Sequence, residues 1–127
     1  LPTGKSRAVL PESLALRECV ALIQRSCHLL ASVANGDWQG VKAGMRDDVL
    51  QSRRKVLVPG FDRVVENAVK AGALGAVLSG AGPSIVALAI DREEQISAAM
   101  RAGFAAEGIR CDILNLLPQP EGVKVFD

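Results

Sequence analysis

The apolar residues of this 127-residue chain recur every three to four positions in several stretches, a spacing typical of helices that bury one face. The longest such stretch covers residues 12–34, and Asn35 with Gly36 after it favours a left-handed helix end. Shorter helices are predicted at residues 38–45, at a segment ending near residue 53, at residues 61–71 and at residues 91–106.

Acidic residues mark the predicted beginnings of three of these helices. Asp37 can cap the second helix, and either Asp47 or Asp48 can cap the third. Asp91, with Glu94 three residues later, has the spacing of a capping box. These acidic side chains therefore predict where the three helices begin, because each can accept hydrogen bonds from free backbone N–H groups.

The pattern changes in the second half of the chain to short, continuous apolar runs. Residues 73–79 and 83–90 are predicted to be buried strands, and the short loop between them requires that they pair antiparallel. Residues 109–117 and 123–126 are predicted to be further short strands. The order of elements predicts an α+β domain, an antiparallel sheet with helices packed on one face. The segment 1–11, which lies between two prolines, is expected to be extended.

Composition excludes several classes of partner. Fifteen basic and 14 acidic residues give a net charge of +1, and aromatic residues make up only 3% of the chain. We therefore expect no nucleic acid and no membrane as partner. Three cysteines without a CxxC spacing are expected to be buried free thiols in a reducing cytoplasm. The sequence begins without methionine, so we expect it to be a fragment of a longer polypeptide.

The stretch LSGAGPSIVAL contains the first candidate for chemistry. Gly80 and Gly82 tolerate positive φ and allow another backbone to come close. A lysine of the Walker type is missing, and the loop leads into a strand instead of a helix, so it is a weak nucleotide site by itself. Two interpretations stay open, an ordinary hairpin turn and a close-approach loop at a functional site.

Cationic side chains supply the other candidates. The run 53–55 is either a solvated helix end or an anion clamp, since a guanidinium can bind a carboxylate through two hydrogen bonds. Thr3, Lys5 and Arg7 are either a loose arm or a hydroxyl and cations on one side of an extended chain. His28 is the only histidine and has no neighbouring ligand at metal spacing, so no metal site is predicted.

Three stretches together resemble the C-terminal half of homoserine kinases, a family within the GHMP small-molecule kinases. They are LPTGKSRAVLP, VLVPGF and GALGAVLSGAGPSIVAL, and the likeness weakens only after residue 110. The resemblance implies that residues 1–127 form a ferredoxin-like GHMP kinase C-terminal domain. It also implies that the N-terminal ATP-binding domain is absent from this chain, because the family's PxxxGLGSS nucleotide loop is not found in it.

The resemblance implies that the intact protein phosphorylates the side-chain hydroxyl of L-homoserine to O-phospho-L-homoserine, in cytoplasmic threonine biosynthesis. ATP and Mg²⁺ would be bound mainly by the absent N-terminal domain, no catalytic residue is expected in this chain, and the fragment alone is expected to be inactive. Members are commonly homodimers. The alternatives are another GHMP kinase and a non-catalytic ferredoxin-like module that binds an amino acid.

Particular residues match the family motifs. Thr3 and Arg7 match the LPTxxxR stretch, and Arg54 matches the arginine before the family's LxPG turn. The resemblance implies that these residues help to hold the amino-acid substrate, with the arginines reaching its carboxylate. Ser52 and Arg53 stand where many members have Pro-Tyr, which leaves Arg53 as a rival for that role.

The loop Ser79, Gly80, Ala81 and Gly82 matches the third motif of the superfamily. The resemblance implies that this loop supports the phosphate loop of the missing domain and that Gly80 lines the substrate site with its backbone. Leu50-Gln51 occupies the place where many members carry a histidine, which is a departure from the family pattern.

Overall fold

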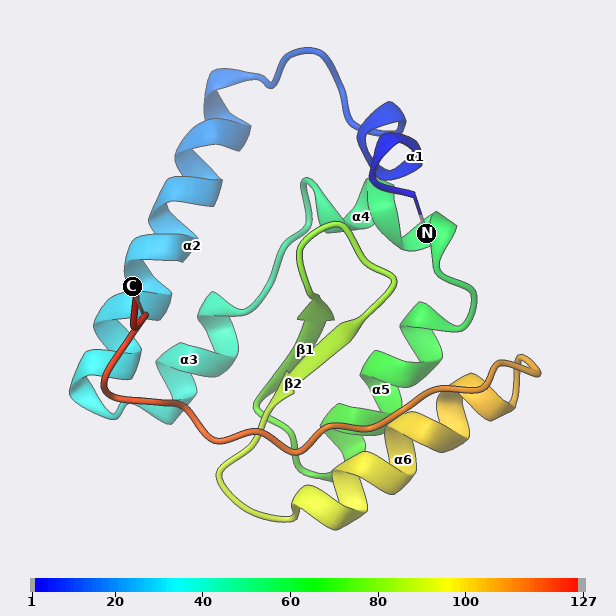
Figure 1. The fold of residues 1–127 in the computed structure, drawn as a ribbon. Helices are drawn as coiled ribbons and strands as arrows, with labels where there is room; N and C mark the ends of the chain where they lie inside the picture. Colours follow the sequence, from blue (N-terminus) through cyan, green and yellow to red (C-terminus); the bar gives the residue numbers. More distant parts are fainter. Residues whose placement is uncertain (1, 126–127) are drawn as a thin grey trace.

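The computed structural model describes residues 2–125 (Figure 1). Its elements, in chain order, are α1 (Thr3–Ala8), α2 (Leu16–Asn35), α3 (Trp38–Gly44), α4 (Gln51–Arg54), the 3-10 helix η1 (Lys55–Leu57), α5 (Phe61–Ala71), β1 (Gly75–Leu78), β2 (Ile85–Leu88) and α6 (Glu93–Ala105). This arrangement confirms the α+β class. In Figure 1 the strands lie between α2 and α3 on one side and α5 and α6 on the other.

The two strands form an antiparallel pair, as predicted. Gly75 lies opposite Leu88 and Leu78 lies opposite Ile85, and both strands are shorter than the apolar runs that predict them. Since side chains alternate between the faces of a sheet, Ala76 and Ala87 face the core under α5 and α6. The neighbouring Val77 faces the other way, toward a cavity on the α2 side.

The core lies between the sheet and the pair α5 and α6. Its buried residues are Val64, Ala68, Ala73, Ala76, Ile96 and Met100. The two helices approach so closely that a Cβ atom added to Gly103 would lie 2.8 Å from Cγ2 of Val64. A glycine in α6 is therefore required by packing and not by backbone conformation.

Helix ends follow the predicted caps at several places. Gly36 ends α2 in the left-handed conformation, with φ of 65°. Asp37 caps α3 by accepting a hydrogen bond from the backbone N–H of Gly40 at 3.0 Å. The bounds predicted for α5 are confirmed, with Gly60 before it and Gly72 after it at positive φ. Local signals therefore place these ends without help from tertiary contacts.

Three predictions near helix starts are wrong. Residues 3–8 form α1, whereas the segment 1–11 was expected to be extended. The predicted capping box of Asp91 and Glu94 does not form, because the N-cap of α6 is Arg92, in the left-handed conformation and without a side-chain cap. The longest helix begins at Leu16 and not at residue 12, and the carboxylate of Glu18 accepts a hydrogen bond from the Ala15 N–H at 2.9 Å.

The strands predicted after α6 are also absent from the described residues. Residues 109–117 and 123–125 have no regular structure, and Phe126 lies outside the described part of the chain. The tail nevertheless contacts the domain, since Ile113 packs against the core and Ser97 of α6 donates a hydrogen bond to Oδ1 of Asn115 at 3.0 Å. Apolar alternation alone does not make a strand, because a strand also needs a partner edge.

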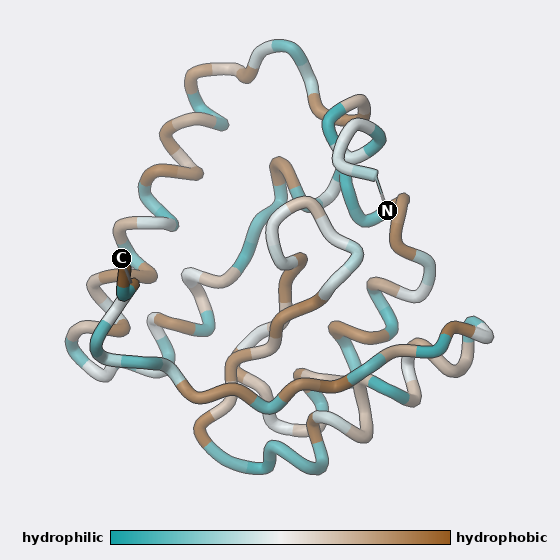
Figure 2. Tube along the Cα trace, in the orientation of Figure 1, coloured by the Kyte–Doolittle hydropathy of each residue, from teal (hydrophilic) through white to brown (hydrophobic). Residues whose placement is uncertain are grey.

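The apolar stripe of α2 is largely uncovered by the described residues. Leu16, Ile23 and Leu30 expose 81%, 64% and 72% of their surface, and hydrophobic positions recur along this helix in Figure 2. Cys27 is exposed and both Cys19 and Cys111 are only partly buried, so the expectation of buried thiols is wrong, although the three cysteines are free. Within residues 2–125, every helix is too short or too polar to cross a bilayer.

Candidate functional site

The loop between β1 and β2 is a hairpin connection built on two glycines at positive φ. Gly80 has φ of 60° and Gly82 has φ of 79°, a region that disfavours side chains with a Cβ atom. The N–H of Ser79 donates to the carbonyl of Ser84 at 2.8 Å, and that of Gly82 donates to the carbonyl of Ser79 at 3.1 Å. These bonds close the loop and leave the carbonyls of Gly80 and Ala81 for other segments.

The first such segment is α1, which the sequence places 75 residues away from the loop. The hydroxyl of Ser6 donates a hydrogen bond to the carbonyl of Ala81 at 2.8 Å. Ser6 has no exposed surface and is the buried residue of its helix. The structure therefore brings the LPTGKSR segment onto the glycine loop through a side chain. The hairpin turn is confirmed, whereas a Cβ atom built on Gly80 would meet nothing within 4 Å, so a close backbone approach at that glycine is not seen among the described residues and its place at a functional site stays a prediction.

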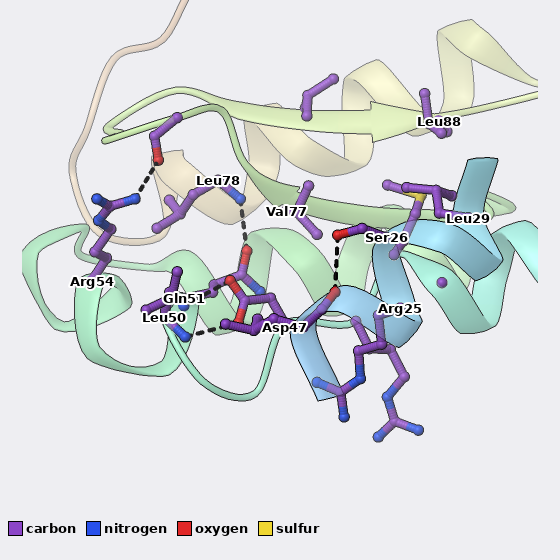
Figure 3. A pocket seen from close by; sticks show the side chains of 16 residues that line it. Arg25, Ser26, Leu29, Asp47, Leu50, Gln51, Arg54, Val77, Leu78 and Leu88 are labelled. Carbon is purple, nitrogen blue, oxygen red and sulfur yellow. Dashed lines mark hydrogen bonds between the residues drawn. The ribbon is translucent and has the colours of Figure 1, made fainter. Parts of the chain in front are cut away.

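The second segment is α4, which contacts the neighbouring carbonyl of the same loop. Nη1 of Arg54 donates to the carbonyl of Gly80 at 3.2 Å, and Oε1 of Gln51 accepts from the N–H of Leu78 at 2.8 Å (Figure 3). Gln51 and Arg54 are three residues apart, so they lie on one face of this short helix. The helix is thus attached to the end of β1 and to the loop that follows.

Asp47 makes this approach possible because it organises the start of α4. Its Oδ1 accepts hydrogen bonds from the N–H groups of Val49 and Leu50 at 2.9 and 2.8 Å, and its Oδ2 accepts one from Gln51 at 3.1 Å. A helix of four residues cannot satisfy these N–H groups internally. Neither predicted aspartate is the N-cap of α4, which is Leu50, but Asp47 accepts hydrogen bonds at the helix start, while Asp48 forms an ion pair with Arg25 at 2.8 Å.

The two adjacent arginines point to different neighbours. Arg53 lies 3.7 Å from a carboxylate oxygen of Glu18 on α2, and its Nε donates to the carbonyl of Val49 at 3.3 Å. Arg54 has no acidic partner within residues 2–125, and its Nε is buried without a hydrogen-bond acceptor among them. Arg54 therefore keeps unused hydrogen-bonding capacity and positive charge next to Gly80.

A cavity of about 560 Å³ opens beside Arg54 and Gly80. Apolar residues of α2 and of the free sheet face make up much of its wall; they are Leu22, Leu29, Val77, Val86 and Leu88. Arg54 and Gly80 lie together at its boundary, whereas Thr3 and Arg7 do not line it. Those two residues are exposed on α1, one helical turn apart, and in the described part of the chain Arg7 has no acidic partner.

Sequence reasoning missed two of the residues that assemble this site. The sequence does not distinguish Ser6 within the LPTGKSR stretch, and it marks Gln51 only as part of a departure from the family pattern. Neither residue type carries a local signal, since both act on backbone atoms far away in the sequence. Within residues 2–125 there is no group of three or more His, Cys, Asp or Glu side chains that could hold a metal ion.

Comparison with known proteins finds similar sequences. The family described as "GHMP kinases C terminal" matches residues 29–106. A homoserine kinase from Persephonella marina is 42% identical over 125 residues, and one from Moorella thermoacetica is 39% identical over 126 residues. These matches cover 98% and 99% of this chain but only 42% and 43% of the relatives. The chain thus spans about two fifths of their length.

The solved structures include a similar fold. A crystal structure of homoserine kinase from Cytophaga hutchinsonii superimposes with a TM-score of 0.79 at 37% sequence identity, over 84% of this chain and 35% of that one. The matched region of the chain contains α5, both strands and the glycine loop. On this agreement of sequence and fold, the chain belongs to the family of GHMP kinase C-terminal domains.

Proposed function

We propose that this chain is the C-terminal part of an ATP-dependent homoserine kinase. The intact enzyme transfers the γ-phosphoryl group of ATP to the side-chain hydroxyl of L-homoserine, giving ADP and O-phospho-L-homoserine. The single observation that carries the proposal is the guanidinium of Arg54, which donates to the Gly80 carbonyl, has no acidic partner within residues 2–125 and lies at a cavity large enough for an amino acid. The names of the relatives in Persephonella marina and Moorella thermoacetica support the choice of substrate.

The geometry suits recognition of the amino-acid end of such a substrate. Arg54 and Arg7 lack acidic partners within residues 2–125 and belong to elements that contact adjacent carbonyls of the loop. In this proposal the substrate carboxylate binds Arg54 at the cavity, and Arg7, which does not line the cavity itself, reaches the same carboxylate from α1 through a charge-assisted hydrogen bond. Thr3, one turn before Arg7 on α1, would add a hydroxyl that orients the substrate.

Phosphoryl transfer requires mainly alignment of the acceptor and neutralisation of charge. In this proposal the chain supplies the alignment, and the backbone of Gly80 forms a wall of the substrate site. The loop Ser79, Gly80, Ala81 and Gly82 supports the phosphate loop of an N-terminal ATP-binding domain. In this proposal that domain binds ATP and Mg²⁺. The 127-residue chain alone is then inactive.

The first experiment measures ADP release by the protein expressed from its complete reading frame. Homoserine, mevalonate and galactose are offered in turn, and we expect release only with homoserine. Release with mevalonate or galactose alone would assign the chain to another GHMP kinase. Calorimetry on the 127-residue chain tests the remaining alternative, since micromolar homoserine binding without the N-terminal domain would favour an amino-acid-binding module.

The second experiment tests the assignment of Arg54. Arg54→Leu should raise the homoserine KM by the equivalent of about 2 to 4 kcal/mol, the scale for losing one partner of a charge-assisted pair. Arg53→Leu is the matched control, because Arg53 contacts Glu18 and not the glycine loop. An Arg54→Leu enzyme with an unchanged homoserine KM would remove Arg54 from the substrate site.

A further inference from the structure

Two uncharged side chains hold the arginine-bearing segments against the glycine loop. Ser6 immediately precedes Arg7 on α1, and Gln51 lies one helical turn before Arg54 on α4. Both make hydrogen bonds to backbone atoms of the β1–β2 hairpin, at 2.8 Å each. Resting on the homoserine kinase function proposed above, we infer that Ser6 and Gln51 are positioning residues that set the substrate-carboxylate site.

Ser6 determines where α1 lies. This helix has only six residues, too few to be stable alone, and Ser6 is its buried residue. Its hydroxyl reaches the carbonyl of Ala81 with no exposed surface, so water cannot replace the bond without movement of the helix. Apolar burial offers little substitute, because Thr3 and Arg7 on the same helix are exposed.

Gln51 has the corresponding role for α4. This helix has four residues and none of them is buried, so packing contributes little to its placement. Oε1 of Gln51 accepts from the N–H of Leu78 on β1 at 2.8 Å. Together with the bond from Arg54 to Gly80, this gives α4 two attachments separated by one residue of the hairpin (Figure 3).

The two attachments matter because the cations come from separate elements. A carboxylate held by guanidinium groups on α1 and α4 requires a fixed separation of those groups, and small displacements are costly for bound substrates. Both elements are attached to the same β1–β2 hairpin, α1 at Ala81 in the loop and α4 at Leu78 at the end of β1. Removing either attachment leaves the arginines present but lets one of them move relative to the other.

The test uses Ser6→Ala and Gln51→Met in the protein from the complete reading frame. Alanine preserves helix propensity in α1, and methionine preserves the length of the Gln51 side chain. Each variant should raise the homoserine KM about fivefold to tenfold, the scale of one lost hydrogen bond to a buried group. The ATP KM and the kcat at saturating homoserine should stay within about twofold, a split that general destabilisation does not produce.

Matched controls make the same chemical changes elsewhere. Ser32→Ala removes the hydroxyl of another buried serine, 4% exposed on α2, and Gln24→Met changes an exposed glutamine on the same helix. Both controls should leave the homoserine KM within about twofold of the wild-type value. Hydrogen exchange gives a second measurement, because the Leu78 amide should exchange faster in Gln51→Met and at the original rate in Gln24→Met.

The outcomes separate the two proposals. A wild-type enzyme that phosphorylates homoserine, with an unchanged homoserine KM in Gln51→Met, overturns the positioning role while the proposed function stands. Equal rises of the homoserine and ATP KM values also overturn it, since they indicate general loosening. A wild-type protein that does not phosphorylate homoserine overturns both proposals. If Ser6→Ala does not fold, Gln51→Met and the exchange rate of Leu78 decide the matter.

Discussion

The contact between α5 and α6 gives a stability prediction that depends on one missing side chain. Gly103 on α6 is buried against Val64 of α5, which has no exposed surface. A Cβ atom at position 103 would lie 2.8 Å from Cγ2 of Val64 and 2.9 Å from its Cα. Gly103→Ala therefore places a methyl group against a backbone atom that cannot rotate away.

The magnitude follows from those distances. Carbon atoms pack at about 3.5 Å or more, so the helices must separate by about 0.6 Å to accept the methyl group. Overpacking of this kind costs about 1 to 3 kcal/mol, and the better helix propensity of alanine returns about 1 kcal/mol. We expect Gly103→Ala to lower the free energy of unfolding by up to about 2 kcal/mol.

Gly4→Ala is the matched control. Gly4 is also helical, but a Cβ atom there would have no neighbour within 4 Å. This variant should be unchanged in stability or gain up to about 1 kcal/mol. Urea unfolding followed by far-ultraviolet circular dichroism measures both variants against the wild type. Equal stability of the two variants would refute the close approach of α5 and α6.

Two further predictions concern side-chain charges. Asp47→Ala should lower the free energy of unfolding by about 1 to 2 kcal/mol, because it leaves the backbone N–H groups at the start of α4 without their acceptor. The same urea unfolding assay measures this variant, with the exposed Asp48→Ala as control. Equal losses of stability in the two variants would contradict the role of Asp47. The Lys70 ammonium lies 2.7 Å from Glu66 and lowers the pKa of that exposed carboxyl. The small stabilisation from this pair is therefore fully present above the ordinary glutamate pKa, and it is lost as the pH falls through the lowered pKa of Glu66. Lys70→Gln should return the Glu66 pKa toward its ordinary value in an NMR titration, and no change would show that the ion pair does not form in solution.

The elements of the fold that could be predicted are those flanked at both ends by residues that favour a turn or a helix end. The helix α5 was predicted with its observed bounds, because the Pro59-Gly60 turn precedes it and Gly72 follows it. Gly60 has φ of 78° and the N–H of Phe61 donates to the carbonyl of Val58 at 3.1 Å, so the turn is closed locally. Such elements need no information from distant parts of the chain.

Elements that depend on distant partners could not be predicted in this way. The helix α1 lies between prolines that favour extended backbone, yet Ser6 is buried against Ala81, 75 residues away. The reverse holds for residues 109–117, where apolar alternation predicts a strand but no strand forms in the described structure. Ile113 is partly buried against the core, so the apolar pattern correctly indicated a segment that contacts the core. The pattern did not indicate whether this segment would form the hydrogen bonds of a strand.

The candidate site shows the same division at the level of single residues. Arg53 and Arg54 are adjacent and chemically identical, so no local property distinguishes them. Consecutive positions on a helix point about 100° apart, so only one of the two can face the hairpin. The orientation of α4 is set by Asp47 at its start and by the bond from Gln51 to Leu78, and that orientation directs Arg54 to Gly80 and Arg53 to Glu18. A change that rotates α4, such as Gln51→Met, should therefore weaken the distinction between Arg54→Leu and Arg53→Leu in the homoserine KM. The test combines Gln51→Met with Arg54→Leu or with Arg53→Leu. If these two double variants differ in homoserine KM as much as the single variants do, Arg54 is directed by its own contact with Gly80 alone.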